Sequence, residues 1–436
     1  MNTFFQREPK NWTRTPLKFL IESSKIGAWG NDAGQDQVDS VCLRVSDFDW
    51  QRLGLNFSQP TIRSFRADQI RRLALVHGDI VLEKSGGGEK TPVGRVVMYS
   101  GAELAVTSNF VARVRPATSV FPKFLLFTLA AQYMSGFSIQ FVKQNTGIQN
   151  LDDSALFRSS VWVPNMDTQK SIADFLDRET ARIDQLIEKK QRLVDLLTER
   201  SLSAIEQAIE SEARLSKLGH HINILPGYAF ASSNFSNNDE DIRLLRGANV
   251  SPGRIKWNDV VYWPKNAVLG MERFILKEGD IVFGMDRPWI SSGVRIAELT
   301  AVDVPSLLLQ RVCKIIPLKS LSKEFLKLLL SSQKFLGYFE PELTGVSVPH
   351  ISGDQIAAFK FSYFPVSEQK ERAVNCRKIL NANKDIVSKA ERTIVLLQEF
   401  RSALITAAVT GQIDVSTWGK KGETERRMDH IEEQMT

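Results

Sequence analysis

The chain has 436 residues, a mass of 49.1 kDa and a net charge of +6. This length exceeds what one ordinary hydrophobic core organises, so we expect two or more domains. The composition is 43% hydrophobic and 24% charged, and the sequence has neither an apolar run long enough to cross a membrane nor a signal-peptide pattern, which predicts a cytoplasmic globular protein. The three cysteines lie far apart and the pair His220 and His221 lacks Cys or acidic neighbours, so no disulfide framework or metal site is expected.

The positive charge is unevenly distributed along the chain. Residues 1–164 carry a net +5 and residues 213–364 a net +4, whereas residues 165–212 carry −4 and residues 365–436 carry +1. Two basic segments therefore alternate with two that are not basic. A modest basic surplus can serve solubility alone, but a segregated one points to a polyanionic partner.

Residues 1–164 have the texture of a mixed domain. β-Branched and aromatic runs such as GDIVL from Gly78 alternate with Gly, Pro and Asn, and one helical patch interrupts them. The glycine-rich loop that follows this strand, SGGGEKT from Ser85, superficially matches a phosphate-binding P-loop. A P-loop has glycine immediately before its lysine, and here that position is Glu89, whose carboxylate would repel a nucleotide. We therefore predict an α+β domain without a nucleotide site.

The second half of the chain repeats the first at an offset of about 200 residues. LVHGDIVLEKSGGG from Leu75 corresponds to LKEGDIVFGMDRPW from Leu276, and NTGIQNL from Asn145 corresponds to LTGVSVPHI from Leu343. Three further short matches follow in the same order. Because one match could arise by chance but an ordered series could not easily do so, we predict a tandem duplication, with a second α+β domain over residues 213–364.

Each domain is followed by a long helical segment, over residues 165–212 and 365–416. Residues 165–212 and 366–410 contain neither Pro nor Gly, and their apolar residues recur at alternating spacings of three and four, which is typical of a coiled coil. We expect the two helices to pack on each other and, at roughly 65 Å each, to hold two domains apart. Residues 417–436 are polar and are expected to be a disordered tail.

A second apolar row widens both helical stripes. It consists of Ile187 and Val194 in the first helix and Val387 and Ile394 in the second. One partner helix needs only a narrow seam. The extra row therefore suggests that another helical protein binds here.

Two similar basic domains on a rigid spacer suit double-stranded DNA, since phosphates supply affinity and base edges supply sequence choice. The glycines would let a loop approach the groove closely. The candidate DNA contacts in the first domain are Arg63, Arg66, Arg71, Lys84, Ser85, Lys90, Arg95, Lys143 and Asn145. Those in the second domain are Arg246, Arg254, Lys256, Arg287, Ser291 and Arg295. Any one of these charges is more often a solvated surface residue than a contact.

The chain resembles the specificity subunits of type I restriction-modification systems. The resemblance rests on the order of domain, helix, domain and helix, on GDIV before a glycine-rich loop, on TGI and TGV before a strand ending in proline, and on EQKER and FRSALITAAVTGQIDV, the latter from Phe400. It covers essentially the whole chain up to about Trp418. The first helix departs from the pattern, because ESEARLSKLG replaces the TGQID ending.

The resemblance implies that each globular domain is a target-recognition domain reading one half of a bipartite, asymmetric DNA site. The two long helices would form an antiparallel coiled coil that fixes the gap and docks modification subunits, two in number, while restriction subunits join the larger complex. S-adenosylmethionine would be held by the modification subunit and ATP with Mg by the restriction subunit. No cofactor is then expected on this chain.

Two other classes remain open. A fused DNA methyltransferase or nuclease would carry an Asn/Asp-Pro-Pro-aromatic motif or a carboxylate cluster beside a lysine, and the sequence has no Pro-Pro pair. A coiled-coil scaffold without DNA would explain the helices but not the paired basic domains. We therefore expect a non-catalytic subunit of a methyltransferase and endonuclease complex.

Overall fold

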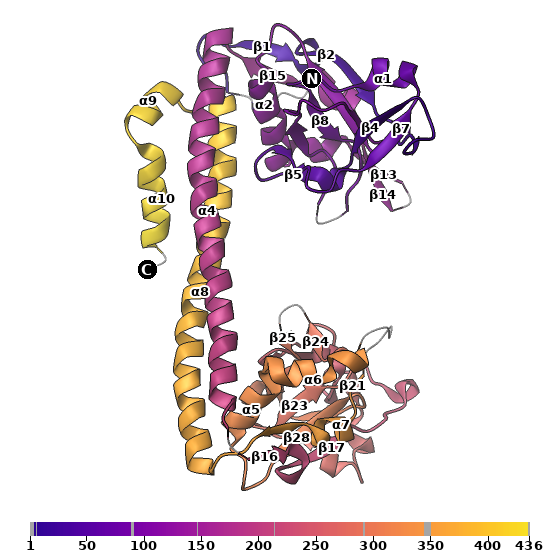
Figure 1. Cartoon of the computed structure of the whole chain (residues 1–436), viewed down its shortest axis with the longest axis vertical. Coiled ribbons are helices and arrows are strands. Elements are labelled where there is room, and N and C mark those ends of the chain that lie inside the picture. The colour runs from indigo at the N-terminus through magenta and orange to yellow at the C-terminus, as the bar shows by residue number, and fades with distance from the viewer. Residues whose placement is uncertain are drawn as a thin grey trace. The chain divides into compact units, whose positions relative to one another are not determined.

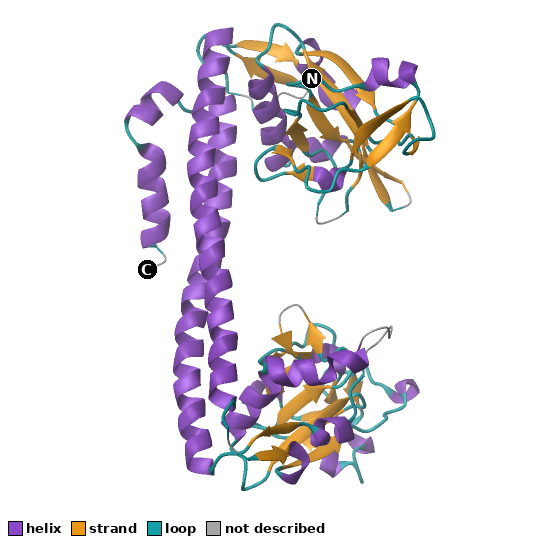
Figure 2. Ribbon diagram, in the orientation of Figure 1, coloured by secondary structure: helices purple, strands orange, loops and turns teal. Residues whose placement is uncertain are grey.

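The computed structural model describes Phe4, Phe5 and residues 7–88, 91–145, 147–212, 214–290, 293–343 and 350–434. The chain divides into two compact units. Unit 1 comprises Met1–Leu193 and Lys389–Thr436, and unit 2 comprises Val194–Ser388. Each unit contains one globular domain and part of each long helix, and helices and strands are mixed in both domains (Figure 2). This agrees with the predicted α+β class.

The domain of unit 1 is built on a central antiparallel sheet in the order β10-β8-β12-β2. Side chains alternate between its two faces: Ile80 and Leu82 pack with helix α2 in one core cluster, and Val81 packs with the second sheet in another. That second sheet has the order β11-β4-β7-β3, with β11 and β4 parallel. The strands are β2 (Ile21–Ile26), β3 (Asn31–Asp32), β4 (Val38–Leu43), β7 (Ile62–Phe65), β8 (Ile80–Glu83), β10 (Val96–Met98), β11 (Ala105–Thr107) and β12 (Val111–Pro116).

Smaller elements complete this domain. A three-stranded sheet in the order β13-β14-β9 carries the glycine-rich segment, and β1 pairs with β15 just before the first long helix. The strands are β1 (Thr13–Pro16), β5 (Phe48–Asp49), β6 (Gly54–Leu55), β9 (Ser85–Gly86), β13 (Val142–Asn145), β14 (Ile148–Leu151) and β15 (Ser160–Val163), and the helices are α1 (Ala67–Leu73), α2 (Pro122–Met134) and α3 (Asp153–Arg158).

The domain of unit 2 repeats this topology. Its central sheet has the order β26-β23-β28-β17, and its second sheet again contains one parallel pair, β18 with β27. The strands are β16 (Leu215–Lys217), β17 (Ile222–Pro226), β18 (Ile242–Leu245), β19 (Val250–Ser251), β20 (Arg254–Ile255), β21 (Tyr262–Trp263), β22 (Ile275–Leu276), β23 (Ile281–Gly284), β24 (Trp289–Ile290), β25 (Gly293–Val294), β26 (Ile296–Glu298), β27 (Ser306–Leu308), β28 (Val312–Pro317) and β29 (Lys360–Ser362). The helices are α5 (Lys323–Ser331), α6 (Gln333–Leu343) and α7 (Gly353–Ala358). The central sheet and the parallel pair therefore confirm the predicted duplication, whereas the fourth strand of the second sheet differs, because β3 pairs with β7 in unit 1 and β22 pairs with β27 in unit 2.

The two long helices are α4 (Met166–Ile209) and α8 (Val366–Val409), each of 44 residues (Figure 1). In unit 1, Asp184 of α4 pairs with Arg401 of α8, so the first half of α4 meets the second half of α8. In unit 2, Ser201 of α4 bonds to Asn383 of α8, so the opposite halves meet. The helices are therefore antiparallel, as the predicted fold requires.

Buried side chains of the two long helices belong to the cores of the domains. In unit 1 the buried Ile183, Leu397 and Leu404 belong to the same core cluster as α2. In unit 2 the buried Ala204 of α4 and Ala373 of α8 join the domain core in the same way. Each domain core thus extends into the helix pair, because the apolar stripe of each helix is shared between the partner helix and the domain.

The C-terminal residues differ from the prediction of a disordered tail. They form α9 (Val415–Lys420) and α10 (Glu423–Glu433). Met428 and Ile431 of α10 pack against the core cluster of unit 1, and Lys190 of α4 pairs with Glu432 at 2.5 Å. These two apolar residues form one partly buried stripe in an otherwise polar segment, which its overall composition did not indicate.

Candidate nucleic-acid interface

The glycine-rich segment of unit 1 is a tight turn of the backbone. Gly86 and Gly87 have φ of 121° and 59°, a region that favours glycine. A Cβ on Gly87 would lie 2.9 Å from the carbonyl oxygen of Thr91, so only glycine fits there. The turn begins at the end of β9, which follows β8 and pairs with β14. The glycines therefore serve the chain path, while Lys90 and Glu89 lie outside the described residues.

Several predicted DNA contacts of this loop region are paired with neighbouring side chains. Arg95 donates Nε to Glu83 at 2.8 Å and Nη2 at 3.1 Å, and Glu83 is only 1% exposed. The hydrogen bonds that Arg95 donates to Glu83 raise the pKa of Arg95, and they outweigh the opposing effect of burial. Lys84 pairs with Asp153 at 2.9 Å. The charge of this surface is therefore largely balanced within the domain.

The neighbouring hairpin and second sheet hold the other candidates. Ser85 donates to Asn150 at 2.6 Å across β9 and β14, and Lys143 on β13 pairs with Asp152 at 2.7 Å. Asn145 ends β13, and its side chain lies outside the described part of the chain. Arg63 donates to the carbonyl oxygens of Trp29 and Gly30, pairs with Asp32 and stacks on the Trp29 ring. Arg66 pairs with Asp68 at 3.1 Å, and Arg71 is exposed on α1.

A cavity of about 770 Å³ lies beside the glycine-rich turn. It brings together the predicted Ser85 and Arg95, and it is also lined by Trp29, Arg44 and Asn109. Sequence reasoning missed Arg44, although LRVSDF from Leu43 is one of the short repeat matches and corresponds to LRGANV from Leu245, which aligns Arg44 with Arg246. Arg44 donates Nη2 to Asp47 at 2.8 Å. The cavity combines an aromatic ring, guanidinium groups and small polar side chains, which are the groups that contact nucleotides.

In unit 2 the equivalent surface has a different charge balance. Gly284 stands where unit 1 has Glu83, and its backbone N–H donates to the carbonyl of Arg295 at 2.9 Å, as Glu83 does to Arg95 at 2.8 Å. Arg295 donates Nη1 to the backbone oxygen of Asp286 at 3.2 Å, while its buried Nε has no partner among the described residues. Burial, and then repulsion by Arg287, lower the pKa of Arg295.

Asp286 offsets the charge of Arg295 only in part, because its attraction is smaller than the effects of burial and of Arg287. Its Oδ1 contacts Nδ1 of His350 at 2.6 Å and its Oδ2 accepts from Arg311 at 2.6 Å. Burial raises the pKa of Asp286, but the hydrogen bonds from His350 and Arg311 outweigh it and leave the pKa lowered. Arg287 is exposed, with a φ of 43° that is strained for a residue other than glycine. Strain of this kind clusters at functional sites.

The remaining candidates of unit 2 lie on nearby strands. Arg246 pairs with Asp259 at 2.7 Å, and its Nε is buried without a partner among the residues that the structure describes. Arg254 on β20 and Lys256 are exposed. Ser291 lies outside the described residues. The structure thus brings Arg287 and Arg295 together and leaves Arg254 and Lys256 as separate surface cations.

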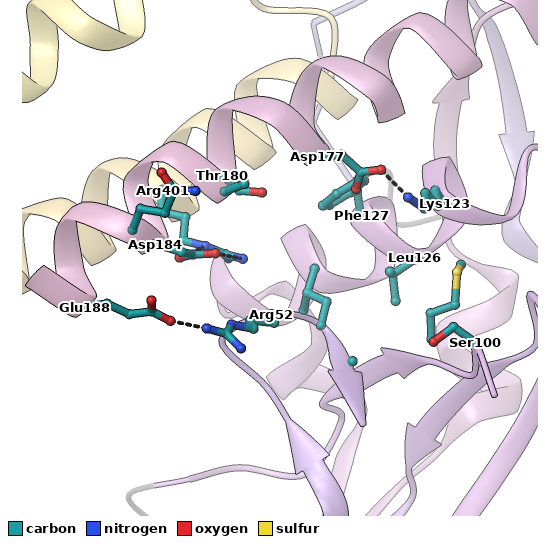
Figure 3. A pocket seen from close by; sticks show the side chains of 15 residues that line it. Arg52, Ser100, Lys123, Leu126, Phe127, Asp177, Thr180, Asp184, Glu188 and Arg401 are labelled. Carbon is teal, nitrogen blue, oxygen red and sulfur yellow. Dashed lines mark hydrogen bonds and ion pairs between the residues drawn. The ribbon is translucent and has the colours of Figure 1, made fainter. Parts of the chain in front are cut away.

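A second cavity, of about 550 Å³, lies where the domain of unit 1 meets the long helices (Figure 3). Three ion pairs cross or border it: Arg52 with Glu188, Lys123 with Asp177, and Arg401 with Asp184. The Arg401 side chain is 8% exposed and also donates to the carbonyl of Gln51. Burial raises the pKa of Asp184, against the attraction of Arg401. This cluster attaches the domain of unit 1 to both helices.

The apolar row predicted for another helical protein is partly used by the chain itself. Ile187 packs against the core cluster of unit 1, Val194 is 9% exposed, and Val387 and Ile394 are partly buried. Larger apolar exposure occurs at neighbouring positions. Among them are Leu196 at 53%, Ile386 at 44% and Val395 at 51%.

The described residues contain neither a helix that could span a membrane nor a metal-binding group of side chains. No helix among them is long and apolar enough to cross a membrane. No group of three or more His, Cys, Asp or Glu side chains in the described ranges could hold a metal ion.

Comparison with known proteins identifies the domain. The family described as "Type I restriction modification DNA specificity domain" matches residues 69–195. The EcoAI specificity subunit of Escherichia coli is 36% identical over 197 residues, which are 44% of this chain and 32% of that protein. The MjaVIII specificity subunit of Methanocaldococcus jannaschii is 28% identical over 275 residues, covering 58% of this chain and 64% of that protein. These matches span between a third and two thirds of the relatives' own lengths.

A solved structure shares the fold. A chain from a study of complex assembly and conformational transition of the type I restriction-modification system superposes with a TM-score of 0.71, covering 93% of this chain and all of that one at 12% identity. Two duplicated recognition domains joined by paired helices define the class of protein. Residues 69–195 match the type I restriction-modification DNA specificity domain, and the predicted resemblance of the chain to the specificity subunits of these systems is confirmed.

Proposed function

We propose that the chain is the DNA-reading subunit of a type I restriction-modification complex. Each globular domain reads one half of a bipartite, asymmetric site, and the paired helices set the number of unspecified base pairs between the halves. The observation that carries this proposal is one scaffold used twice with different side chains at equivalent positions. Glu83 and Gly284 occupy equivalent positions, each opposite an arginine. Ser85 and Asp286 are also equivalent, and they lie opposite Asn150 and His350 respectively.

Sequence choice by two such domains follows from the chemistry of their loops. Phosphate contacts position a protein on DNA, and side chains that reach base edges select the sequence. The unit 1 surface offers neutral pairs such as Ser85 with Asn150, whereas the unit 2 surface offers the arginines 287 and 295. Two surfaces of different chemistry would select two different half-sites, which makes the whole site asymmetric.

The remaining chemistry belongs to partner subunits in this proposal. Modification subunits, two in number, dock on the helix pair and hold S-adenosylmethionine, while restriction subunits hold ATP with Mg in the larger cytoplasmic complex. The chain itself binds no cofactor and catalyses no step. The sequence supports this division, because it has no Pro-Pro pair of the kind an amino-methyltransferase motif requires.

A domain exchange tests the proposal. Residues 1–164 are replaced by the matching domain of a relative, the chimera is expressed with the cognate modification subunit, and methylated sites are mapped across a genome. We expect one half-site to change while the other half-site and the gap stay the same. Simultaneous change of both half-sites would exclude independent reading by the two domains.

A matched control separates the rival classes. The purified chain alone is incubated with labelled S-adenosylmethionine and DNA, and DNA binding is measured over a range of salt concentrations. We expect no methyl transfer and a salt-dependent affinity. Methyl transfer by the chain alone would support a fused enzyme. DNA binding is measured for the chain alone and for its complex with the modification subunit, and an absence of binding by the complex would support a scaffold.

A further inference from the structure

Two arginines at equivalent positions in the duplicated domains differ in one neighbour. Arg95 and Arg295 each accept a backbone hydrogen bond from the strand beside them, from Glu83 in unit 1 and from Gly284 in unit 2. The Glu83 carboxylate occupies the donors of Arg95 with two bonds. Gly284 has no side chain, so the same donors of Arg295 meet no carboxylate.

The other groups around Arg295 compensate its charge only in part, because the attraction of Asp286 is smaller than the effects of burial and of Arg287. Its Nη1 donates to a neutral backbone oxygen, and its buried Nε has no partner in the described part of the chain. Both carboxylate oxygens of Asp286 are taken, by His350 and Arg311. Arg287 adds a further positive charge nearby, because it repels Arg295 strongly enough to be one of the causes of its pKa shift.

A buried donor without an acceptor is costly, and an acceptor on a ligand is one way in which such a donor becomes satisfied. The planar guanidinium presents parallel N–H groups that fit two acceptors at once. In DNA, the O6 and N7 atoms of guanine form such a pair in the major groove, and a phosphate group forms another.

We propose that Arg295, assisted by Arg287, donates hydrogen bonds from the second recognition domain to a pair of acceptors on DNA, either a guanine edge or a phosphate. Its donors are open to DNA because Gly284 stands where Glu83 blocks Arg95 in the first domain. This inference rests on the proposed function and deepens it, since it assigns the chemistry read by one domain. It also predicts that Arg95 does not make the equivalent contact while Glu83 holds it.

The test uses the complex of the full chain with its modification subunit. Affinity is measured for duplexes that carry the mapped site and every single-base change in the second half-site, at several salt concentrations. The variants are Arg295→Lys, which keeps the charge but loses the planar fork, Arg295→Gln, which loses both, and Gly284→Glu, which restores the blocking carboxylate. Arg273→Lys is the matched control, because Arg273 is exposed in the same domain and stacks on Phe274.

The results distinguish a contact of Arg295 with a guanine base from a contact with a phosphate group. For a guanine contact, both Arg295 variants weaken binding about 10- to 100-fold at the wild-type site and relax the preference at one G·C pair. For a phosphate contact, Arg295→Gln weakens all duplexes alike and lowers the salt slope by about one, while Arg295→Lys has a smaller effect. Gly284→Glu is expected to reproduce Arg295→Gln in either case, and first half-site preferences stay unchanged.

Wild-type affinity, base preference and salt slope in both Arg295 variants would overturn the inference. A Cβ on Gly284 would lie 3.2 Å from the Cβ of Arg295, so Gly284→Glu can also perturb packing. The Arg295 variants add no atoms and decide the question without it. If the wild-type complex itself recognises no bipartite site, the proposed function fails rather than this inference.

Discussion

Asn383 donates Nδ2 to Ser201 Oγ at 2.9 Å and to the backbone oxygen of Leu197 at 3.3 Å, across the helix pair of unit 2. Asn383 is 2% exposed and is the strongly polar member of an otherwise apolar seam. A polar residue buried in a coiled coil disfavours every register in which it loses its partner, at a cost in stability. Asn383 therefore fixes the alignment of α8 on α4.

The variant Asn383→Leu should keep or raise the thermal stability, because two hydrogen bonds worth about 1 kcal/mol each are exchanged for apolar burial of similar or larger worth. It should also allow shifted registers of the helix pair. Methylation mapping of the variant complex is expected to show the same half-sites with more than one gap length. A single wild-type gap would show that other contacts set the register.

The pair Asp184 and Arg401 is expected to behave as a buried ion pair at the helix junction of unit 1. Asp184→Asn or Arg401→Met alone should lower the free energy of unfolding by about 3 kcal/mol, because each leaves the other group without its partner. The double variant Asp184→Asn with Arg401→Met should recover part of this loss. Chemical denaturation of the four proteins measures the coupling. Additive losses would mean that the two groups act independently.

The pH dependence of this pair has a defined sign. Burial raises the pKa of Asp184 in the folded chain, so the folded state holds this proton more tightly than the unfolded state. The contribution of Asp184 to stability is therefore fully present below its unfolded pKa of about 3.9 and decreases as the pH rises through the folded value. The free energy of unfolding of the wild type should therefore fall, relative to that of Asp184→Asn, as the pH rises through the mildly acidic range. A pH-independent difference would contradict the raised pKa.

The helices can be tested as a ruler. Seven residues of matching pattern are inserted after Leu193 and after Thr393, so that both seams stay in phase. The insertion adds roughly 10 Å of helix, or about three base pairs. We expect unchanged half-sites and a wider gap in methylation maps, with reduced activity because three pairs also rotate one half-site about the DNA axis. An active variant with the wild-type gap would show that the helices do not set the distance.

Removal of residues 415–436 distinguishes a packed C-terminal helix from a disordered tail. Trp418, Met428 and Ile431 pack against the core cluster of unit 1. Truncation should therefore lower the free energy of unfolding by about 2 kcal/mol or more through lost apolar burial. The substitution Glu425→Gln is the control, since its exposed ion pair with Arg182 contributes about 0–1 kcal/mol. Unchanged stability after truncation would support the sequence-based expectation of disorder.

The sequence predicted the architecture because the repeat and the helical period are patterns that can be recognised along the chain without knowing which residues are in contact. The repeat at about 200 residues and the coiled-coil period both survive as strand order and helix pairing. The helices α9 and α10 escaped prediction, because Met428 and Ile431 form too short a stripe among charged residues to indicate burial.

The candidate site was less predictable. Residue type alone marks Arg63, Arg95 and Arg295 alike as basic, but their partners come from other strands. Arg63 is held by Trp29 and Asp32, and Arg95 by Glu83. Whether an arginine is available for DNA depends on the side chain opposite it in the sheet, which sequence spacing does not define.

The order of the units along the chain has a consequence for synthesis. Unit 2 is a continuous stretch, Val194–Ser388, inserted between the two parts of unit 1. The core cluster of unit 1 includes Leu397, Leu404 and Ile405, which leave the ribosome only after all of unit 2 has been made. The first domain synthesised is thus the last whose core can be completed. A chain released between the two long helices would expose the apolar faces that α8 covers in the finished protein.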